Sequence, residues 1–110
     1  MKPKRVTRTA ATFVQEITRY IHRDNPAAAR AYRRAVSETF AAFDERFLPR
    51  RASENLPEYV RAVTVKGFPG YTLRVAVLPD AIVLVAAFAP YLSDQMVQSR
   101  SESGLAEEDC

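Results

Sequence analysis

Several residue types are scarce in this chain of 110 residues, and each scarcity excludes a kind of site. The one cysteine, Cys110, has no partner for an internal disulfide, which fits a reducing cytoplasm, and we expect the protein there. That cysteine and the one histidine, His22, fall short of the roughly four ligands of a zinc site. The three glycines match neither glycine-rich phosphate-binding fingerprint. The sequence therefore predicts neither a metal nor a cofactor.

Long hydrophobic runs are missing as well. The longest, from Ala81 to Ala89, has nine residues, whereas a helix that spans a membrane needs ~20. A run of this length that is apolar at every position is typical of a strand with both faces buried. We expect a buried strand here and no membrane association.

Basic residues are plentiful, and they gather in the N-terminal half of the chain. Residues 1–51 hold twelve Lys and Arg against five Asp and Glu, and residues 52–110 hold four against eight. Thirteen of the sixteen bases are arginine, whose planar fork favours bidentate pairing with carboxylates or phosphates. This asymmetry favours an acidic partner. The alternative is that these charges only solvate a helix surface.

Two helices are predicted by apolar residues spaced three and four positions apart. The first follows a capping Thr9 and places its apolar residues on one face: Ala10, Phe13, Val14, Ile17 and Ile21. Asn25 and Pro26 separate it from the second helix, because Pro26 suits a first helical position and Asn25 can cap it. The apolar stripe of the second helix continues to Phe47, and Pro49 ends the helix. So short a linker predicts a helix hairpin.

After residue 57 the pattern changes from helical spacing to alternation. Strands are predicted at 61–66, 71–77 and 82–88, joined as an antiparallel meander with 82–88 in the centre. Lys4 to Arg8 predicts a short edge strand. The predicted fold class is α+β, in the order β-α-α-β-β-β, with the helix hairpin packed on a small antiparallel sheet. We expect one domain over residues 1–98 and an acidic, disordered tail over 99–110.

Short strings in matching order resemble the RelE/ParE toxin superfamily of bacterial toxin–antitoxin systems. Residues 16–29 resemble the family's "EI-x-x-YI" pattern in the first helix and the "NP-x-A-A" start of the second. Residues 65–75 resemble the "GFP-x-Y" turn that enters a strand, and residues 77–85 resemble the final hairpin. The resemblance extends over about residues 4–92.

The resemblance implies a small β-α-α-β-β-β toxin, made beside a cognate antitoxin whose acidic segment wraps around it. One branch of the superfamily cleaves messenger RNA in the ribosomal A site, and the ParE branch inhibits DNA gyrase. The toxin–antitoxin complex commonly represses its own operon, so operator DNA is expected as a partner only through that complex. The "NP-x-A-A" signature is more like the ParE branch.

The residues with which the RNA-cleaving branch works are not matched. That branch has an arginine directly after the Gly-Tyr pair, where this chain has Thr72, and basic residues just past the last strand, where it has Pro-Tyr-Leu-Ser-Asp. Cleavage needs a positive group at the developing charge and a general acid or base within reach. We therefore expect no catalytic residue and a ParE-like toxin that binds a protein target. The alternatives are a RelE-type ribonuclease with a rearranged site and a non-toxic, antitoxin-binding or repressor component.

The candidate partner-binding residues are basic or aromatic. Three lie off the apolar stripe of the second helix and three lie near the sheet: Arg30, Arg33, Arg34, Arg61, Arg74 and Tyr91. They suit an acidic, partly disordered partner that folds on contact. Together with Lys66, the residues near the sheet also suit a second interpretation, in which the basic side chains hold RNA phosphates and Tyr91 stacks on a base. A third is that the strand arginines only protect an edge.

Overall fold

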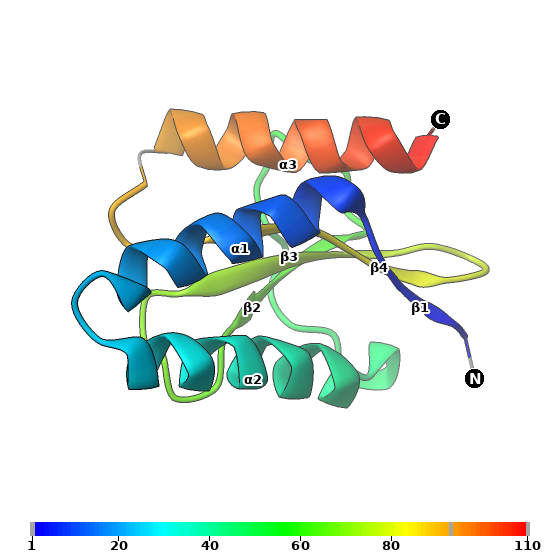
Figure 1. The fold of residues 1–110 in the computed structure, drawn as a ribbon. Coiled ribbons are helices and arrows are strands. Elements are labelled where there is room, and N and C mark those ends of the chain that lie inside the picture. The colour runs from blue at the N-terminus through cyan, green and yellow to red at the C-terminus, as the bar shows by residue number, and fades with distance from the viewer. Residues whose placement is uncertain (1, 93, 110) are drawn as a thin grey trace.

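Alternating apolar residues build the sheet at the centre of the computed structural model, which describes residues 2–92 and 94–109. The sheet has four strands in the order β1-β4-β3-β2 (Figure 1). β2 (Val60–Thr64), β3 (Thr72–Val77) and β4 (Ile82–Phe88) form the predicted antiparallel meander, with β4 in the interior. β1 (Lys4–Val6) is the predicted edge strand. It pairs with β4 in parallel, which makes the sheet mixed.

A bulge in β4 changes which face its side chains occupy. Leu84 and Ala86 lie opposite consecutive residues of β3, so Val85 has no partner on that strand. An extra residue of this kind shifts the alternation by one position. Leu84 and Ala87 therefore belong to the same core although three positions separate them.

The predicted helix hairpin consists of α1 (Arg8–His22) and α2 (Pro26–Ala42). At the start of α2 the Asn25 side chain accepts a hydrogen bond from the Ala28 amide at 3.1 Å, as predicted. The predicted cap of α1 is wrong by two residues, because Thr7 caps the helix and Thr9 lies inside it. Either threonine could cap the helix from its sequence alone. The Thr7 amide donates to the Leu84 carbonyl at 3.1 Å, and this bond fixes Thr7 at the end of β1, where the helix begins.

The second helix is shorter than predicted. It ends at Ala42 instead of continuing to Phe47, and a short 3-10 helix, η1 (Glu45–Phe47), follows. The physical reason is Asp44, whose side chain accepts a hydrogen bond from the Arg46 amide at 2.9 Å and so begins the new turn. Phe47 is consequently 77% exposed and takes no part in the core.

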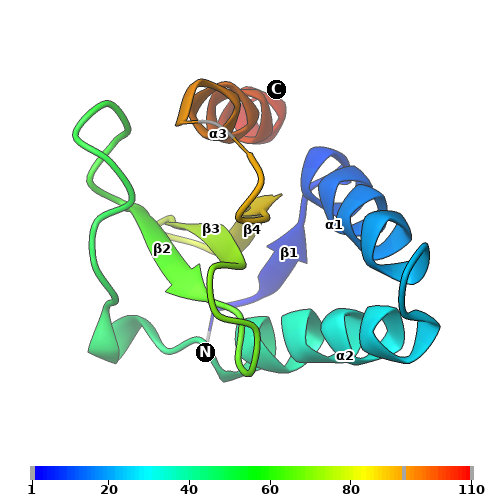
Figure 2. The ribbon, with the colours of Figure 1, turned by 90° about the vertical axis from the view of Figure 1, so that its left-hand side faces the viewer.

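The helices cover both faces of the sheet. Figure 2 shows α2 on one side of the sheet and α3 (Asp94–Asp109) on the other, with α1 beside both. The larger core lies between the hairpin and the sheet and includes Ile17, Tyr32, Leu73 and Leu84. A smaller core on the second face includes Val83 and is covered in part by Leu105 of α3. This second cover explains why residues 82–88 are apolar on both faces.

The predicted disordered tail is instead helical, because residues 99–109 belong to α3. Gly104 brings this helix against the backbone of β4: a Cβ atom at this position would lie 1.9 Å from the Val85 carbonyl oxygen. Ser101 is fully buried, and its hydroxyl donates to the Val97 carbonyl at 2.8 Å. Small residues make the contact, so the segment carries no apolar periodicity from which a helix could be predicted.

Candidate partner-binding surfaces

The three predicted arginines of α2 lie together on its outer side. Arg30, Arg33 and Arg34 are exposed, whereas the residues that α2 buries include Ala29 and Tyr32. Within the described parts of the chain, none of the three arginines forms an ion pair. We call them the α2 arginine row. They span about one helical turn and present three solvated guanidinium groups to a partner.

Arg61, the fourth predicted residue, has a structural role. It lies on β2, and its Nη1 atom donates to the Pro49 carbonyl at 3.3 Å. Its Nη2 atom lies 3.8 Å from a carboxylate oxygen of Glu58, and its side chain is 17% exposed. These contacts hold β2 to the segment before it.

Arg74, the fifth predicted residue, is buried in the sheet. Its residue exposure is 8%, and the centre of its guanidinium group lies 4.9 Å from the centroid of the Phe88 ring. Burial lowers the pKa of Arg74, and the positive charge of Arg50 lowers it further. The side chain therefore does not belong to an exposed basic surface.

Tyr91, the sixth predicted residue, lies against α1 instead of beside Arg61 and Arg74. Its ring stacks on Tyr20 with the centroids 4.4 Å apart, and both rings remain nearly half exposed. The pair borders a cavity of about 420 Å³ on the outer side of α1, which we call the Tyr20–Tyr91 cavity. Its lining consists of Thr12, Gln15, Glu16, Arg19, Tyr20, Arg23 and Tyr91.

Charges of both signs surround the Tyr20–Tyr91 cavity. Glu16 is neutralised by Arg100 of α3, whose Nη2 atom lies 2.7 Å from its carboxylate. Arg19 and Arg23 are exposed and have no carboxylate partner among the residues that the structure describes. Burial raises the pKa of Tyr91, and the negative charge of Glu16 raises it further. The hydroxyl thus stays protonated, and the cavity combines aromatic faces with two available cations.

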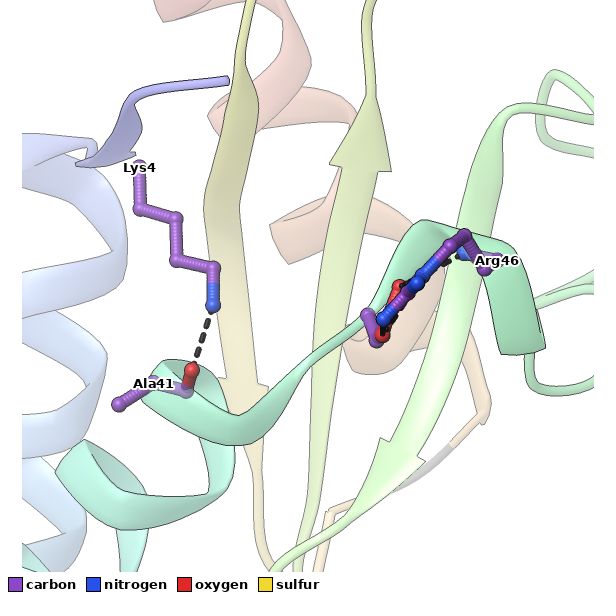
Figure 3. Close-up of polar contacts among 4 residues, drawn as sticks. Lys4, Ala41 and Arg46 are labelled. Atoms are coloured by element: carbon purple, nitrogen blue, oxygen red, sulfur yellow. Dashed lines mark hydrogen bonds and ion pairs between the residues drawn. The ribbon is translucent and has the colours of Figure 1, made fainter. Parts of the chain in front are cut away.

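Two further basic side chains, Lys4 and Arg46, are engaged by other groups of the protein (Figure 3). Lys4 of β1 donates to the Ala41 carbonyl at 2.6 Å, at the C-terminal end of α2, where a cation suits the helix dipole. Arg46 lies 2.8 Å from the carboxylate of Asp44, and its hydrogen bonds lower the pKa of Asp44 to about 2. These two cations are engaged, in contrast to the α2 arginine row.

The described residues also limit the chemistry of the protein. Among residues 2–92 and 94–109, no three His, Cys, Asp or Glu side chains are grouped as a metal would require. No helix within the same ranges is long and apolar enough to cross a membrane.

The structure separates the six predicted residues into distinct places. The α2 arginine row and Tyr91 are exposed on different elements, and Arg61 and Arg74 are largely buried. Sequence reasoning missed Arg19, Tyr20 and Arg23, which line the cavity with Tyr91. Their spacing of three and four positions on the polar side of the first helix is the signal that indicates a shared surface.

A helix hairpin packed on a four-stranded sheet, with a basic outer surface, defines a small α+β protein of a known class. The profile of the ParE toxin of type II toxin–antitoxin systems, parDE, matches residues 5–90. Because the match extends over most of the chain, the protein belongs to the ParE toxin family.

Comparison with solved structures agrees on the fold. A chain of the chromosomal ParDE toxin–antitoxin system from P. aeruginosa superposes with a TM-score of 0.69 at 20% sequence identity. The match covers 81% of this chain and 96% of that one, so about a fifth of this chain has no counterpart there. None of the curated proteins compared with the sequence matches it.

Proposed function

We propose that this chain is the toxin of a two-protein system, that it acts by binding a protein target, and that a cognate antitoxin neutralises it. The observation that carries the proposal is the α2 arginine row, which offers three exposed guanidinium groups without carboxylate partners among the described residues. An acidic segment of an antitoxin supplies those partners. DNA gyrase, the target of the ParE branch, is the first target to test.

Binding is favoured over RNA cleavage by the residues around the end of β4. The position after the Gly-Tyr pair is Thr72, and β4 is followed by Pro90 and Tyr91. The basic residue of β3, Arg74, is buried against Phe88. Phosphoryl transfer needs a cation at the developing charge and a general acid or base, and these residues do not provide such a set.

The remaining partners follow from the same proposal. The antitoxin carries the contact with operator DNA, so the toxin reaches DNA only within the complex. The Tyr20–Tyr91 cavity is proposed as a second contact surface, because tyrosine and arginine are enriched where interfaces derive most of their binding energy. Both proposed partners are cytoplasmic, and we place the chain in the same compartment.

The test is expression of the chain in bacteria, alone and together with the product of the neighbouring small reading frame. We expect growth arrest from the chain alone, intact cellular mRNA, and rescue by the second protein. Purified chain is expected to inhibit supercoiling by DNA gyrase. Replacement of Arg30, Arg33 and Arg34 by Gln weakens rescue, because the antitoxin loses about three charged contacts.

The matched control replaces three exposed bases elsewhere, Arg8, Arg46 and Lys66, by Gln, which removes the same charge and leaves rescue unchanged. Growth without any defect contradicts a toxin and leaves the non-toxic, antitoxin-binding component. Arrest with degraded mRNA contradicts the protein target and favours the ribonuclease. Equal loss of rescue in both triple variants shows that net charge matters and the α2 arginine row does not.

A further inference from the structure

Arg74 is a buried cation without a counter-charge. The residue is 8% exposed, and its Nε and Nη1 atoms are buried without a hydrogen-bond partner among the described residues. No carboxylate in the described ranges forms an ion pair with it. Buried guanidinium groups in proteins are normally paired, because an uncompensated charge in a dry environment is costly.

The surroundings of Arg74 offset only part of that cost. Its neighbours across the strands are Ala62 of β2 and Ala86 of β4, which carry no polar side-chain atoms. The Phe88 ring, 4.9 Å from the guanidinium centre, attracts the cation through its π face. A ring of this kind does not replace hydrogen bonds from Nε and Nη1, so the donors on these two atoms stay unused.

A second cation, Arg50, adds to the uncompensated positive charge around Arg74. Arg50 lies beside β2, where its carbonyl accepts a hydrogen bond from the Ala62 amide at 3.1 Å. Ala62 in turn pairs with Arg74, so the two arginines flank one residue of the sheet. Their like charges repel each other, and one anion between them relieves the repulsion and satisfies the free donors.

The position favours a carboxylate on a polypeptide over a nucleic acid. Ala76 belongs to the core that α3 partly covers, and Arg74, two positions earlier on β3, faces the same side of the sheet by alternation. The segment before β2 rises on that side as well (Figure 2). Gln98 of α3 donates to the Asn55 carbonyl at 3.3 Å and joins the two. One buried guanidinium with alanine as its neighbour on each adjacent strand suits a single acidic side chain. Phosphate backbones, in contrast, are held by several exposed basic residues.

We infer that Arg74, with Arg50 beside it, is the receptor for one carboxylate that a polypeptide partner presents to the sheet. The partner is the antitoxin of the proposed function, whose acidic segment complements the two positive charges, and to that extent the inference rests on that function. Arg74 destabilises the free chain, and the bound carboxylate returns that stability to the complex. Arg74 thus contributes to binding and lowers the free energy of unfolding of the unbound chain.

The first experiment compares two arginines on neighbouring strands by thermal unfolding of the full chain. Arg74→Met removes the uncompensated charge and is expected to raise Tm by about 4 °C. The matched control is Arg61→Met: the Nε atom of Arg61 is also buried without a partner among the described residues, but its Nη atoms contact the Pro49 carbonyl and the Glu58 carboxylate, so its removal is expected to lower Tm. A lower Tm for Arg74→Met means that Arg74 stabilises the free chain and overturns the inference.

The second experiment tests the anion itself, with acetate and inorganic phosphate as probes at matched ionic strength. We expect acetate to raise the Tm of the wild-type chain by about 2 °C over chloride and to leave Arg74→Met unchanged. In the wild type, acetate also shifts the ¹⁵N resonance of the Arg74 Nε atom, which reports binding even where the variant folds poorly. A response to phosphate without one to acetate, or to neither, overturns the inference.

These measurements need no partner protein and no growth phenotype. Failure of the proposed function, seen as growth without arrest, therefore leaves the acetate result standing. Failure of the acetate response leaves the toxin assay untouched. The two outcomes are separable.

Discussion

At the scale of single residues, Tyr32 shows that the hairpin core is held by ring packing. Its ring contacts Phe68 and Tyr71 with centroids 5.6 Å and 5.5 Å away, and the residue is fully buried. Its hydroxyl has no hydrogen-bond partner in the part of the chain that the structure describes. Burial of that oxygen raises the pKa of Tyr32, as desolvation of a charged form must. The aromatic faces stabilise the fold, and the hydroxyl opposes it.

We expect Tyr32→Phe to stabilise the protein by about 0.5–1 kcal/mol, since it removes an unsatisfied polar atom and keeps the ring. Chemical denaturation measures the change. Tyr20→Phe is the control, because Tyr20 is 46% exposed and its hydroxyl reaches solvent, so its free energy of unfolding stays constant. A less stable Tyr32→Phe means that the hydroxyl is satisfied in solution.

Substitution of Gly104 by alanine is expected to destabilise the protein, although the same substitution stabilises most helices. Replacing an exposed helical glycine by alanine stabilises a helix by about 1 kcal/mol. At this position the new Cβ atom meets the Val85 carbonyl oxygen at 1.9 Å, and that oxygen belongs to the backbone of a central strand. The strand cannot move aside, so α3 must withdraw.

We therefore expect Gly104→Ala to destabilise the chain by about 2 kcal/mol and to accelerate amide exchange throughout α3. Thermal unfolding and hydrogen exchange by mass spectrometry measure the two effects. Ser103→Ala, at the adjacent and exposed position, leaves both unchanged. Equal exchange rates in the Gly104→Ala variant and the wild type contradict the close approach of α3 to β4.

At the scale of elements, the sequence predicts best where the signal is local. Residues 82–88 form a strand with the predicted bounds, because nine consecutive apolar residues need burial on two faces. Asn25 and Pro26 place the start of α2 for an equally local reason. The end of α2 depends on the side chain of Asp44, which carries no apolar signal, and the whole of α3 depends on contacts with distant residues, so neither follows from the hydrophobic pattern. The candidate partner-binding residues divide in the same way: the exposure of the α2 arginines follows from helical periodicity, whereas the burial of Arg74 depends on neighbours along three strands.

The C-terminal part of α3 caps another helix. The Glu107 carboxylate accepts hydrogen bonds from the Arg8 amide at 2.6 Å and the Thr9 amide at 2.8 Å, at the N-terminus of α1. The hydroxyl of Thr9 also donates to it. A carboxylate suits the positive end of a helix dipole. These contacts, the Thr9 hydroxyl foremost, lower the pKa of Glu107 below its usual 4.5.

A lowered pKa in the folded state fixes the sign of the pH dependence. The contribution of Glu107 to the docking of α3 is present above the ordinary pKa and is lost as the pH falls through the lowered value. We expect amide protection in α3 to decrease on acidification below about pH 4, and Glu107→Gln to show weak protection at every pH. Hydrogen exchange across a pH series measures this. Glu102→Gln, which leaves the N-terminus of α1 untouched, keeps the wild-type profile.

At the scale of the whole molecule, the surfaces proposed for partners lie on different parts of one rigid frame. The α2 arginine row is on the outer side of the hairpin, the Tyr20–Tyr91 cavity is between α1 and the chain after β4, and Arg74 is on the sheet face toward α3. An extended antitoxin can contact more than one of them at once, since disordered segments that fold on binding wrap large surfaces. A compact target contacts one of these surfaces at a time.

The bond between Arg8 and Glu107 joins positions 99 residues apart, which ties the folding of this protein to its translation. Ribosomes add roughly 5–20 residues per second, so the first helix waits on the order of ten seconds for the group that caps it. Late in that interval, after β4 has been made and before α3 is complete, the strand bearing Val83 and Val85 lacks the cover that α3 later gives it. A nascent chain therefore shows chaperones and any protein made beside it a hydrophobic surface that the finished protein conceals.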